Sequence, residues 1–226
     1  MKSRTLAVAA AIALASFGCN HSTEPKTTQP PSLVANDTPA HAIERLITSY
    51  EKKNESAFAG MFTGNYQYEF SNATDPNLVT DYATGWFKAD ETESSSHLFA
   101  GYTPPGGSTK EAASAITITL AVKSPTDDNS SGVDPVTHKI LATRVDGQMV
   151  VPQPGADALT YVIDNNFNAF YIVRGDSAVG LDASQPADAQ HWYVYRWRDL
   201  TGVATPRLST QATRPNTWGS LKAMYR

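Results

Sequence analysis

The residues best suited to binding or acid–base chemistry gather near the end of the chain, in the segment HWYVYRWRDLTG, residues 191–202. Its indole and phenol rings can stack on a ligand, and its imidazole and guanidinium groups can donate hydrogen bonds. Successive side chains of a strand point to opposite faces of a sheet. This period predicts one largely aromatic face, which carries His191, Tyr193, Tyr195 and Trp197.

The opposite face of this strand would carry Trp192, Val194, Arg196 and Arg198. The two guanidinium groups could bind an anion or a partner, or they could pair with an acid on a neighbouring strand. The sequence does not identify such an acid.

A second group of rings would meet the same interior. The segment Tyr66–Phe70 alternates with period two, which predicts a strand with an aromatic face. Such rings can simply fill a core, and we favour that interpretation because core aromatics outnumber ligand-binding ones. In the alternative, tyrosine hydroxyls and a histidine line a partly wet pocket. Its lining would be Tyr66, Tyr68, Phe70, Trp86, His97, His191, Tyr193, Tyr195 and Trp197.

No constellation typical of catalysis is evident. The histidines, at positions 21, 41, 97, 138 and 191, are scattered, and neither a G-x-S-x-G nor an H-E-x-x-H motif occurs. Asp81, Asp164 and Asp182 lie in predicted loops. We therefore assign no catalytic residue and expect no cofactor.

One loop partly matches a calcium site. Asp127, Asn129, Ser131 and Gly132 copy positions 1, 3, 5 and 6 of an EF-hand loop, but position 12 is His138 instead of a bidentate glutamate. A polar hairpin loop explains this segment better, and we expect no metal site.

The N-terminus reads as a secretory signal. Lys2 and Arg4 precede the apolar run Leu6–Phe17, whose twelve residues would span about 18 Å as a helix, against about 30 Å for a bilayer core. Cleavage after Ala15 would leave Ser16 first and Cys19 as a free thiol. Alternatively, Ser16-Phe17-Gly18-Cys19 resembles a bacterial lipobox, with Ser16 where leucine is preferred. Lipidation explains why the chain has a single cysteine, so we favour it.

The organisation that follows is a signal peptide at residues 1–18, a lipidated Cys19 with a disordered tether to residue 37, and one domain at residues 38–226. Residues 1–18 hold two of the 18 Lys and Arg and none of the 22 Asp and Glu, so the rest has a formal charge of −6. This acidic balance argues against a nucleic-acid partner. No later stretch is long and apolar enough to span a bilayer.

The order of elements predicts an α+β fold. Thr38-Pro39 should start a helix with a stripe at Ile43, Leu46, Ile47 and Tyr50, and a shorter helix should cover residues 55–62. After the strand at 66–70 come a loop to residue 87 and a helix capped by Asp90. The expected later elements are strands at 115–122, 139–145, 148–151, 160–163, 169–174 and 191–198, with turns at Asp146-Gly147 and 164–166, and a helix at 218–224.

The opening segment AIERLITSYEKKNESAFAGMFTGNYQYEFS resembles the NTF2-like (SnoaL-like) superfamily. The segments YEFSNATDP, WFKADETESSSHLF, WYVYRWRDL and TWGSLKAMYR are similar to a group of uncharacterised bacterial lipoproteins of that fold. The resemblance implies N-terminal helices packed on a curved antiparallel sheet around an open-mouthed, cone-shaped cavity. It implies no reaction, because the superfamily contains both enzymes and binding domains, and no family catalytic residue maps onto this chain.

The resulting hypothesis is a lipoprotein of the bacterial cell envelope, anchored to the membrane by its N-terminal lipid. It would bind a small apolar or amphipathic ligand, or an envelope partner, without catalysis. The alternative function is a SnoaL-like enzyme that uses general acid–base chemistry on a hydrophobic substrate. The alternative location is outside the cell, as a secreted soluble protein. A homodimer through the exposed sheet face is a third expectation. The enzyme requires a buried acid or histidine facing a tyrosine inside an open cavity.

Overall fold

A computed structural model describes residues 32–71, 76–121, 123–201 and 217–226. The expected signal peptide, Cys19 and the tether up to residue 31 lie outside this range. Residues Leu33–Arg226 form a compact unit. Among the described residues, no helix meets the length and hydropathy expected of a membrane span.

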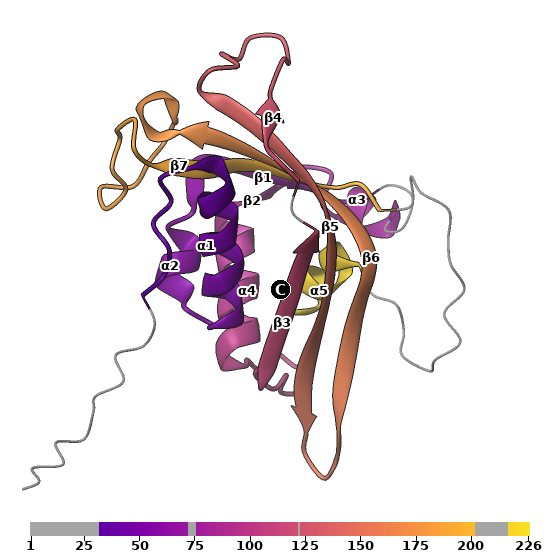
Figure 1. Ribbon diagram of the computed structural model, residues 1–226. Coiled ribbons are helices and arrows are strands. Elements are labelled where there is room, and N and C mark those ends of the chain that lie inside the picture. Colours follow the sequence, from indigo (N-terminus) through magenta and orange to yellow (C-terminus); the bar gives the residue numbers. More distant parts are fainter. Residues whose placement is uncertain (1–31, 72–75, 122, 202–216) are drawn as a thin grey trace, which may run out of the picture. The chain divides into compact units, whose positions relative to one another are not determined.

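Helices dominate the first half of the unit (Figure 1). The first begins as expected: the Thr38 side chain accepts a hydrogen bond of 3.1 Å from the backbone N–H of His41, and Pro39 occupies the first turn. The fourth begins at Lys88, so Asp90 does not precede it but caps it from inside, accepting from the N–H of Phe87 at 2.7 Å. The helices are α1 (Pro39–Glu51), α2 (Glu55–Ala59), α3 (Pro76–Asp81), α4 (Lys88–Ala100) and α5 (Trp218–Met224).

The strands form one sheet with the order β2-β1-β7-β6-β5-β3, and β4 pairs with β5 outside this path. All neighbours are antiparallel except β1 and β7, which are parallel. A 3-10 turn, η1 (Gly175–Ser177), follows β6. The strands are β1 (Phe62–Glu69), β2 (Trp86–Phe87), β3 (Ala115–Ala121), β4 (Thr126–Asp127), β5 (His138–Gln153), β6 (Ala156–Arg174) and β7 (Trp192–Asp199).

The expected turns at Asp146-Gly147 and at residues 164–166 are wrong. β5 and β6 run through both segments as one long hairpin, and their pairing register shifts between Val145 and Gly147. Asp146 accepts a hydrogen bond of 2.7 Å from the N–H of Asn165, which has a φ of 55°. The Asp-Gly pair therefore lies opposite a β-bulge in β6, where Asp164 and Asn165 face Asp146 alone and the extra residue bends the strand without ending it.

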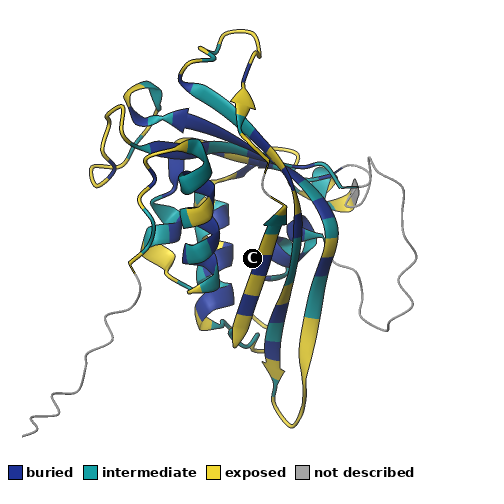
Figure 2. Ribbon diagram, viewed as in Figure 1, coloured by how far each residue is buried: buried dark blue, intermediate teal, exposed yellow. Residues whose placement is uncertain are grey.

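The bent sheet wraps one side of the helices. In Figure 1, β5 and β6 curve past α4, and α5 lies inside the curve. Figure 2 colours the tip of the hairpin as exposed and much of the sheet nearer the helices as buried. The α+β class, with N-terminal helices packed on a curved antiparallel sheet, is confirmed by this arrangement.

Tyr50 of α1 joins the helices to the interior. Its ring centroid lies 5.0 Å from that of Phe58 in α2, 5.1 Å from that of Phe99 in α4 and 5.0 Å from that of Trp218 in α5. Ring pairs at these separations add to the stabilisation from burial alone. The predicted stripe of α1 is buried as expected, and it contacts the helix that ends the chain.

Gly101, which ends α4, and the nearby Gly106 both have a positive φ, and they allow the effect of crowding at the end of α4 to be measured. Gly101, with φ 75° and ψ 159°, occupies a backbone region used almost only by glycine, and a Cβ there would lie 2.9 Å from the backbone of Lys110 and Ala112. Gly106 has φ 70° but open space around it. We expect Gly106→Ala to lower the free energy of unfolding by about 1–2 kcal/mol and Gly101→Ala by roughly 3 kcal/mol or more. Urea denaturation measures both, and equal losses would contradict the crowding at Gly101.

Candidate functional site

The expected division of β7 into two faces is wrong because the strand contains a bulge. Tyr171 of β6 pairs with Arg196 and its neighbour Ile172 pairs with Val194, so Tyr195 is an extra residue. A bulge places two residues of one strand opposite one of the other and interrupts the alternation. The residues of β7 that join the main core cluster are Trp192, Val194 and Trp197.

Tyr195 consequently lies on the other face of the sheet from Tyr68. Its hydroxyl donates a hydrogen bond of 2.6 Å to the carboxylate of Asp128, and its ring packs edge-on against His138 at 5.5 Å. Burial, reinforced by Asp128, raises the pKa of the Tyr195 phenol, which stays protonated. Tyr193 and His191 also lie away from the main cluster: the Tyr193 hydroxyl donates to the carbonyl of Pro186 at 3.0 Å, and the His191 ring contacts Asp188 at 2.8 Å.

The acid that the sequence did not identify for the two arginines is Glu69. Because β1 runs parallel to β7, Glu69 pairs in register with Arg198, and the two side chains form an ion pair of 2.7 Å. The same carboxylate pairs with Arg196, whose guanidinium also lies 4.9 Å from the centre of the Tyr171 ring. The arginines of β7 thus have partners within the chain.

Most of the remaining predicted lining residues converge on the concave side. Tyr68 lies edge-on to Trp197 with ring centroids 5.6 Å apart, and Phe70 is edge-on to Trp86 at 5.4 Å. His97 is placed apart from them, stacked on Tyr102 at 3.9 Å with its Nδ1 2.7 Å from the carbonyl oxygen of Tyr225. The predicted residues with fully buried side chains are Tyr66, Tyr68, Trp86, Tyr193 and Trp197.

At the centre of this side lies a carboxylate that the sequence analysis missed. Glu91 of α4 is 0% exposed, and its Oε2 accepts hydrogen bonds from Lys222 Nζ at 2.7 Å, Trp86 Nε1 at 3.0 Å and the Tyr66 hydroxyl at 3.3 Å. Its Oε1 has no hydrogen-bond partner in the described part of the chain. Burial, reinforced by the charge of Glu91, raises the pKa of Tyr66, so the phenol remains a donor.

A signal for Glu91 was present in the sequence of α4. Its buried residues include Glu91, Ser94, Ser95 and Leu98, at i, i+3, i+4 and i+7. This is the spacing of a buried helix face. A helix that must bury a face with so few apolar residues has to bury polar ones, and each of those needs a partner.

The partner is Lys222, in the C-terminal helix α5. Its side chain is 1% exposed, and Nζ lies 3.7 Å from the centre of the Trp197 ring and 3.9 Å from that of Tyr68. Burial lowers the pKa of Lys222 to about 8, while the charges of Glu91 and Asp199 act in the opposite direction. The amine is therefore mostly protonated at neutral pH, inside a cage of one carboxylate and two aromatic faces.

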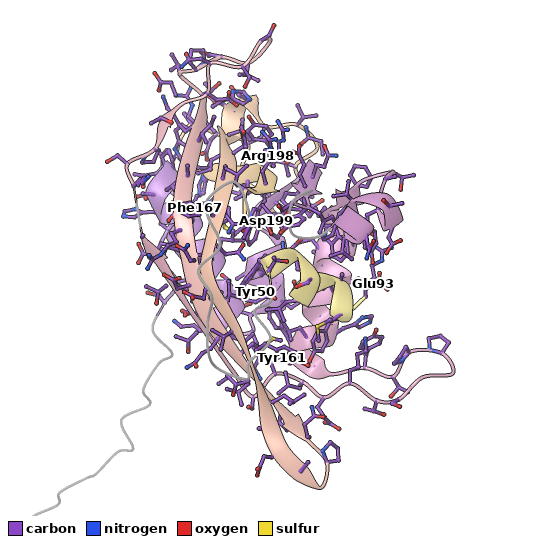
Figure 3. All side chains as sticks on the ribbon, turned by 90° about the vertical axis from the view of Figure 1, so that its right-hand side faces the viewer. Tyr50, Glu93, Tyr161, Phe167, Arg198 and Asp199 are labelled. Carbon is purple, nitrogen blue, oxygen red and sulfur yellow. The ribbon has the colours of Figure 1, made fainter. Side chains whose placement is uncertain are left out.

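The C-terminal helix occupies the concave side of the sheet. Trp218 stacks on Trp197 of β7 at 5.6 Å and touches Tyr50 of α1 at 5.0 Å, so it lies between the sheet and the helix layer. Figure 3 shows α5 beside the labelled Tyr50 and Asp199. The open-mouthed cavity implied by the resemblance is, on this side, filled by Trp218, Leu221 and Lys222.

The loop that partly matches a calcium site is held by contacts of its own. Asp127 pairs with Lys139 at 2.5 Å, and Asp128 accepts a hydrogen bond of 2.9 Å from the N–H of Ser130. Within the ranges that the structure describes, no three His, Cys, Asp or Glu side chains are grouped so that they could hold a metal ion.

Comparison with known proteins gives a likeness of fold. No family model and no curated protein sequence matches the chain. Similar solved structures include a ketosteroid isomerase-like protein from Erwinia carotovora atroseptica, with TM-score 0.40 and 9% identity over 70% of this chain and 89% of that one. An NTF2-like superfamily protein from Salmonella enterica serovar Typhimurium has TM-score 0.41 and 7% identity over 77% and 92%. An NTF2-like protein "of unknown function in nutrient uptake" from Rhodospirillum rubrum has TM-score 0.40 and 10% identity over 72% and 96%.

The buried ion pair predicts a large and asymmetric effect of mutation. Lys222→Ala leaves the Glu91 carboxylate buried without its counter-charge and should lower the free energy of unfolding by about 3–5 kcal/mol. The double variant Glu91→Gln/Lys222→Met removes both charges, so its free energy of unfolding should fall by less than that of Lys222→Ala. Arg144→Ala, which removes a cation that is 49% exposed, is the control and should lose less than about 1 kcal/mol. If Lys222→Ala lowers the free energy of unfolding by no more than Arg144→Ala does, the assignment of a buried ion pair is contradicted.

The lowered pKa of Lys222 also predicts a pH dependence. Between about 8 in the folded protein and the ordinary value of 10.5, the unfolded chain binds more protons at this residue than the folded one. The contribution of Lys222 to the free energy of unfolding should therefore rise with pH across this interval and be constant below it. Urea denaturation at pH 7 and pH 9.5 measures this contribution. From the lower to the higher pH, the free energy of unfolding of the wild type should rise relative to that of the Glu91→Gln/Lys222→Met variant. If the free energy of unfolding of the wild type instead falls relative to that of the variant at pH 9.5, the lowered pKa of Lys222 is refuted.

Proposed function

We propose that this chain is an exported, lipid-anchored NTF2-like domain of the bacterial cell envelope that binds a small amphipathic ligand without catalysis. The observation that carries the proposal is the state of its interior acid. Glu91 faces Tyr66, as an acid–base pair would, but its Oε2 already accepts three hydrogen bonds and its counter-charge comes from the chain itself.

The SnoaL-like enzyme is disfavoured on the same ground. A general base must reach the proton that it removes, directly or through one water. Glu91 is 0% exposed, and the C-terminal helix lies over it through Lys222. The geometry supports a role in holding charge in an apolar interior more than a role in moving protons.

A ligand that takes the place of the α5 side chains would meet walls better suited to an amphipathic molecule than to a purely apolar one. The walls are large rings such as Trp86 and Trp197, and they include the Glu91 carboxylate, whose counter-charge is the buried ammonium of Lys222. Ligand sites of this kind combine mostly apolar walls with a few placed polar groups. A homodimer through the outer sheet face and an envelope protein as partner stay predictions.

Anchoring is proposed from the N-terminal sequence. The single cysteine, Cys19, follows a short apolar run and precedes a polar, proline-containing segment. Acyl chains on this residue would hold the domain at a membrane, and several chains anchor stably where one is marginal. The alternative is cleavage after Ala15 and release of a soluble protein.

Cys19→Ala tests both parts of the proposal. We expect the wild type in the membrane fraction and the variant in the soluble fraction, because the variant lacks the acylated thiol; Ser16→Ala is the control and should stay with the membrane. Mass spectrometry of the wild type should give an acylated Cys19 as the first residue. A soluble wild type that begins at Ser16 would contradict the anchor.

The released Cys19→Ala protein then tests binding. Purified gently and measured by native mass spectrometry, it should retain a small molecule that is lost on denaturation. A bare polypeptide mass, together with no thermal shift against a panel of charged and neutral amphiphiles, would remove the binding role and leave the anchor unaffected.

A further inference from the structure

The surroundings of the Lys222 amine have the chemistry of a binding site for an organic cation. Its Nζ lies 2.7 Å from the Glu91 carboxylate, 3.7 Å from the centre of the Trp197 ring and 3.9 Å from that of Tyr68. Cations within about 6 Å of a ring centre are attracted by its electron-rich face, most strongly when water is excluded. The Lys222 side chain thus shows that the interior can hold one alkylammonium group.

The groups of the cage also have hydrogen bonds that do not involve the helix that fills it. Glu91 is fixed on α4 by the hydrogen bonds from Trp86 and Tyr66. Trp197 is fixed on β7 because its Nε1 donates a hydrogen bond of 2.7 Å to the side-chain oxygen of buried Asn168. These groups belong to the sheet and to α4, and the hydrogen bonds named here do not involve α5.

The helix that carries Lys222 is attached differently from the strands around it. α5 has seven residues, too few to be a stable helix alone, and it takes part in no strand pairing. It is held by side chains: the Lys222–Glu91 ion pair, Trp218 stacking on Trp197, Ser94 donating to the Lys222 carbonyl at 2.7 Å, and His97 at the Tyr225 carbonyl. Because α5 contributes no strand to the sheet, its displacement would leave the strand pairing intact.

We propose that the cage of Glu91, Tyr68 and Trp197 is a binding site for a primary alkylammonium group, and that Lys222 occupies it when no ligand is bound. The inference rests on the proposed binding role and gives its ligand a chemical class: an amphipathic amine. The ammonium of the ligand would replace that of Lys222, and its apolar part would replace Trp218 and Leu221. The C-terminal helix is then a competitor that the ligand displaces.

Chemical rescue of a Lys222→Ala variant of the full chain tests the cage. The variant lacks the ammonium but keeps the other groups, so n-butylammonium should enter and stabilise it. At a concentration about 100-fold above its dissociation constant, we expect a rise in melting temperature of roughly 5 °C or more. Sodium chloride at equal ionic strength and neutral 1-butanol should give no such rise, nor should n-butylammonium with the surface variant Arg144→Ala.

A second variant links the rescue to the carboxylate. In Glu91→Gln/Lys222→Ala, the amide keeps an acceptor but has no charge, and n-butylammonium should bind about tenfold more weakly or not at all. If Lys222→Ala alone is unfolded, n-butylammonium should restore its near-ultraviolet circular dichroism. Absence of both rescue and refolding, or equal rescue by 1-butanol, overturns the proposal.

Displacement of α5 is tested on the unmodified chain. Lys222 is itself a trypsin site, protected because its side chain is 1% exposed. n-Hexylammonium should accelerate cleavage after Lys222 in a saturable way, whereas 1-hexanol should not. Acceleration by both amphiphiles, or by neither, contradicts an ammonium-selective cage. If the protein meanwhile retains a neutral amphiphile in the native mass spectrum, the binding role survives and only the ammonium site fails.

Discussion

The ion pair between Glu91 and Lys222 is the constraint on which the interior of this protein depends. Both side chains are almost completely buried, and a buried charge without a counter-charge is strongly unfavourable. Each residue therefore requires the other, and the pair fixes α5 against α4. Because the ammonium also lies on the faces of Tyr68 and Trp197, the same contact ties both helices to the sheet. Through this ion pair, the concave side is filled by the protein's own C-terminal helix.

The bulge in β7 is what makes this cage possible. If the same residues formed a strand without a bulge, strict alternation would place Trp197 on the opposite face from Trp192 and Val194. With the bulge at Tyr195, all three face the core, while Tyr195 and Arg196 face outward, toward Tyr171. The outer face then becomes a polar surface organised by Glu69, and the inner face becomes the aromatic wall around Lys222. One inserted residue thus separates the arginines of the strand from its buried tryptophans.

Local signals in the sequence were sufficient wherever a short segment decides its own structure. The Thr38-Pro39 cap and the apolar stripe of α1 were predicted and observed, as were the aromatic alternation of β1 and the helix at the C-terminus. The same kind of signal failed at Asp146-Gly147, because this dipeptide lies inside β5, opposite a bulge in β6, and not in a hairpin turn. The neighbouring β3 lies close by: a Cβ on Gly147 would lie 2.8 Å from the carbonyl of Thr117, so a strand packs where a turn was expected.

By itself, then, the sequence determined the α+β class, the course of α1 and the abundance of rings for an interior, since these follow from caps, periodicity and composition within a few residues. Only the tertiary structure decided which rings share a face, that Glu69 is the acid for Arg196 and Arg198, and that Glu91 meets Lys222. The physical reason is range. A bulge shifts every later residue of its strand to the other face, and an ion pair between residues 131 positions apart leaves no trace in the spacing of either segment.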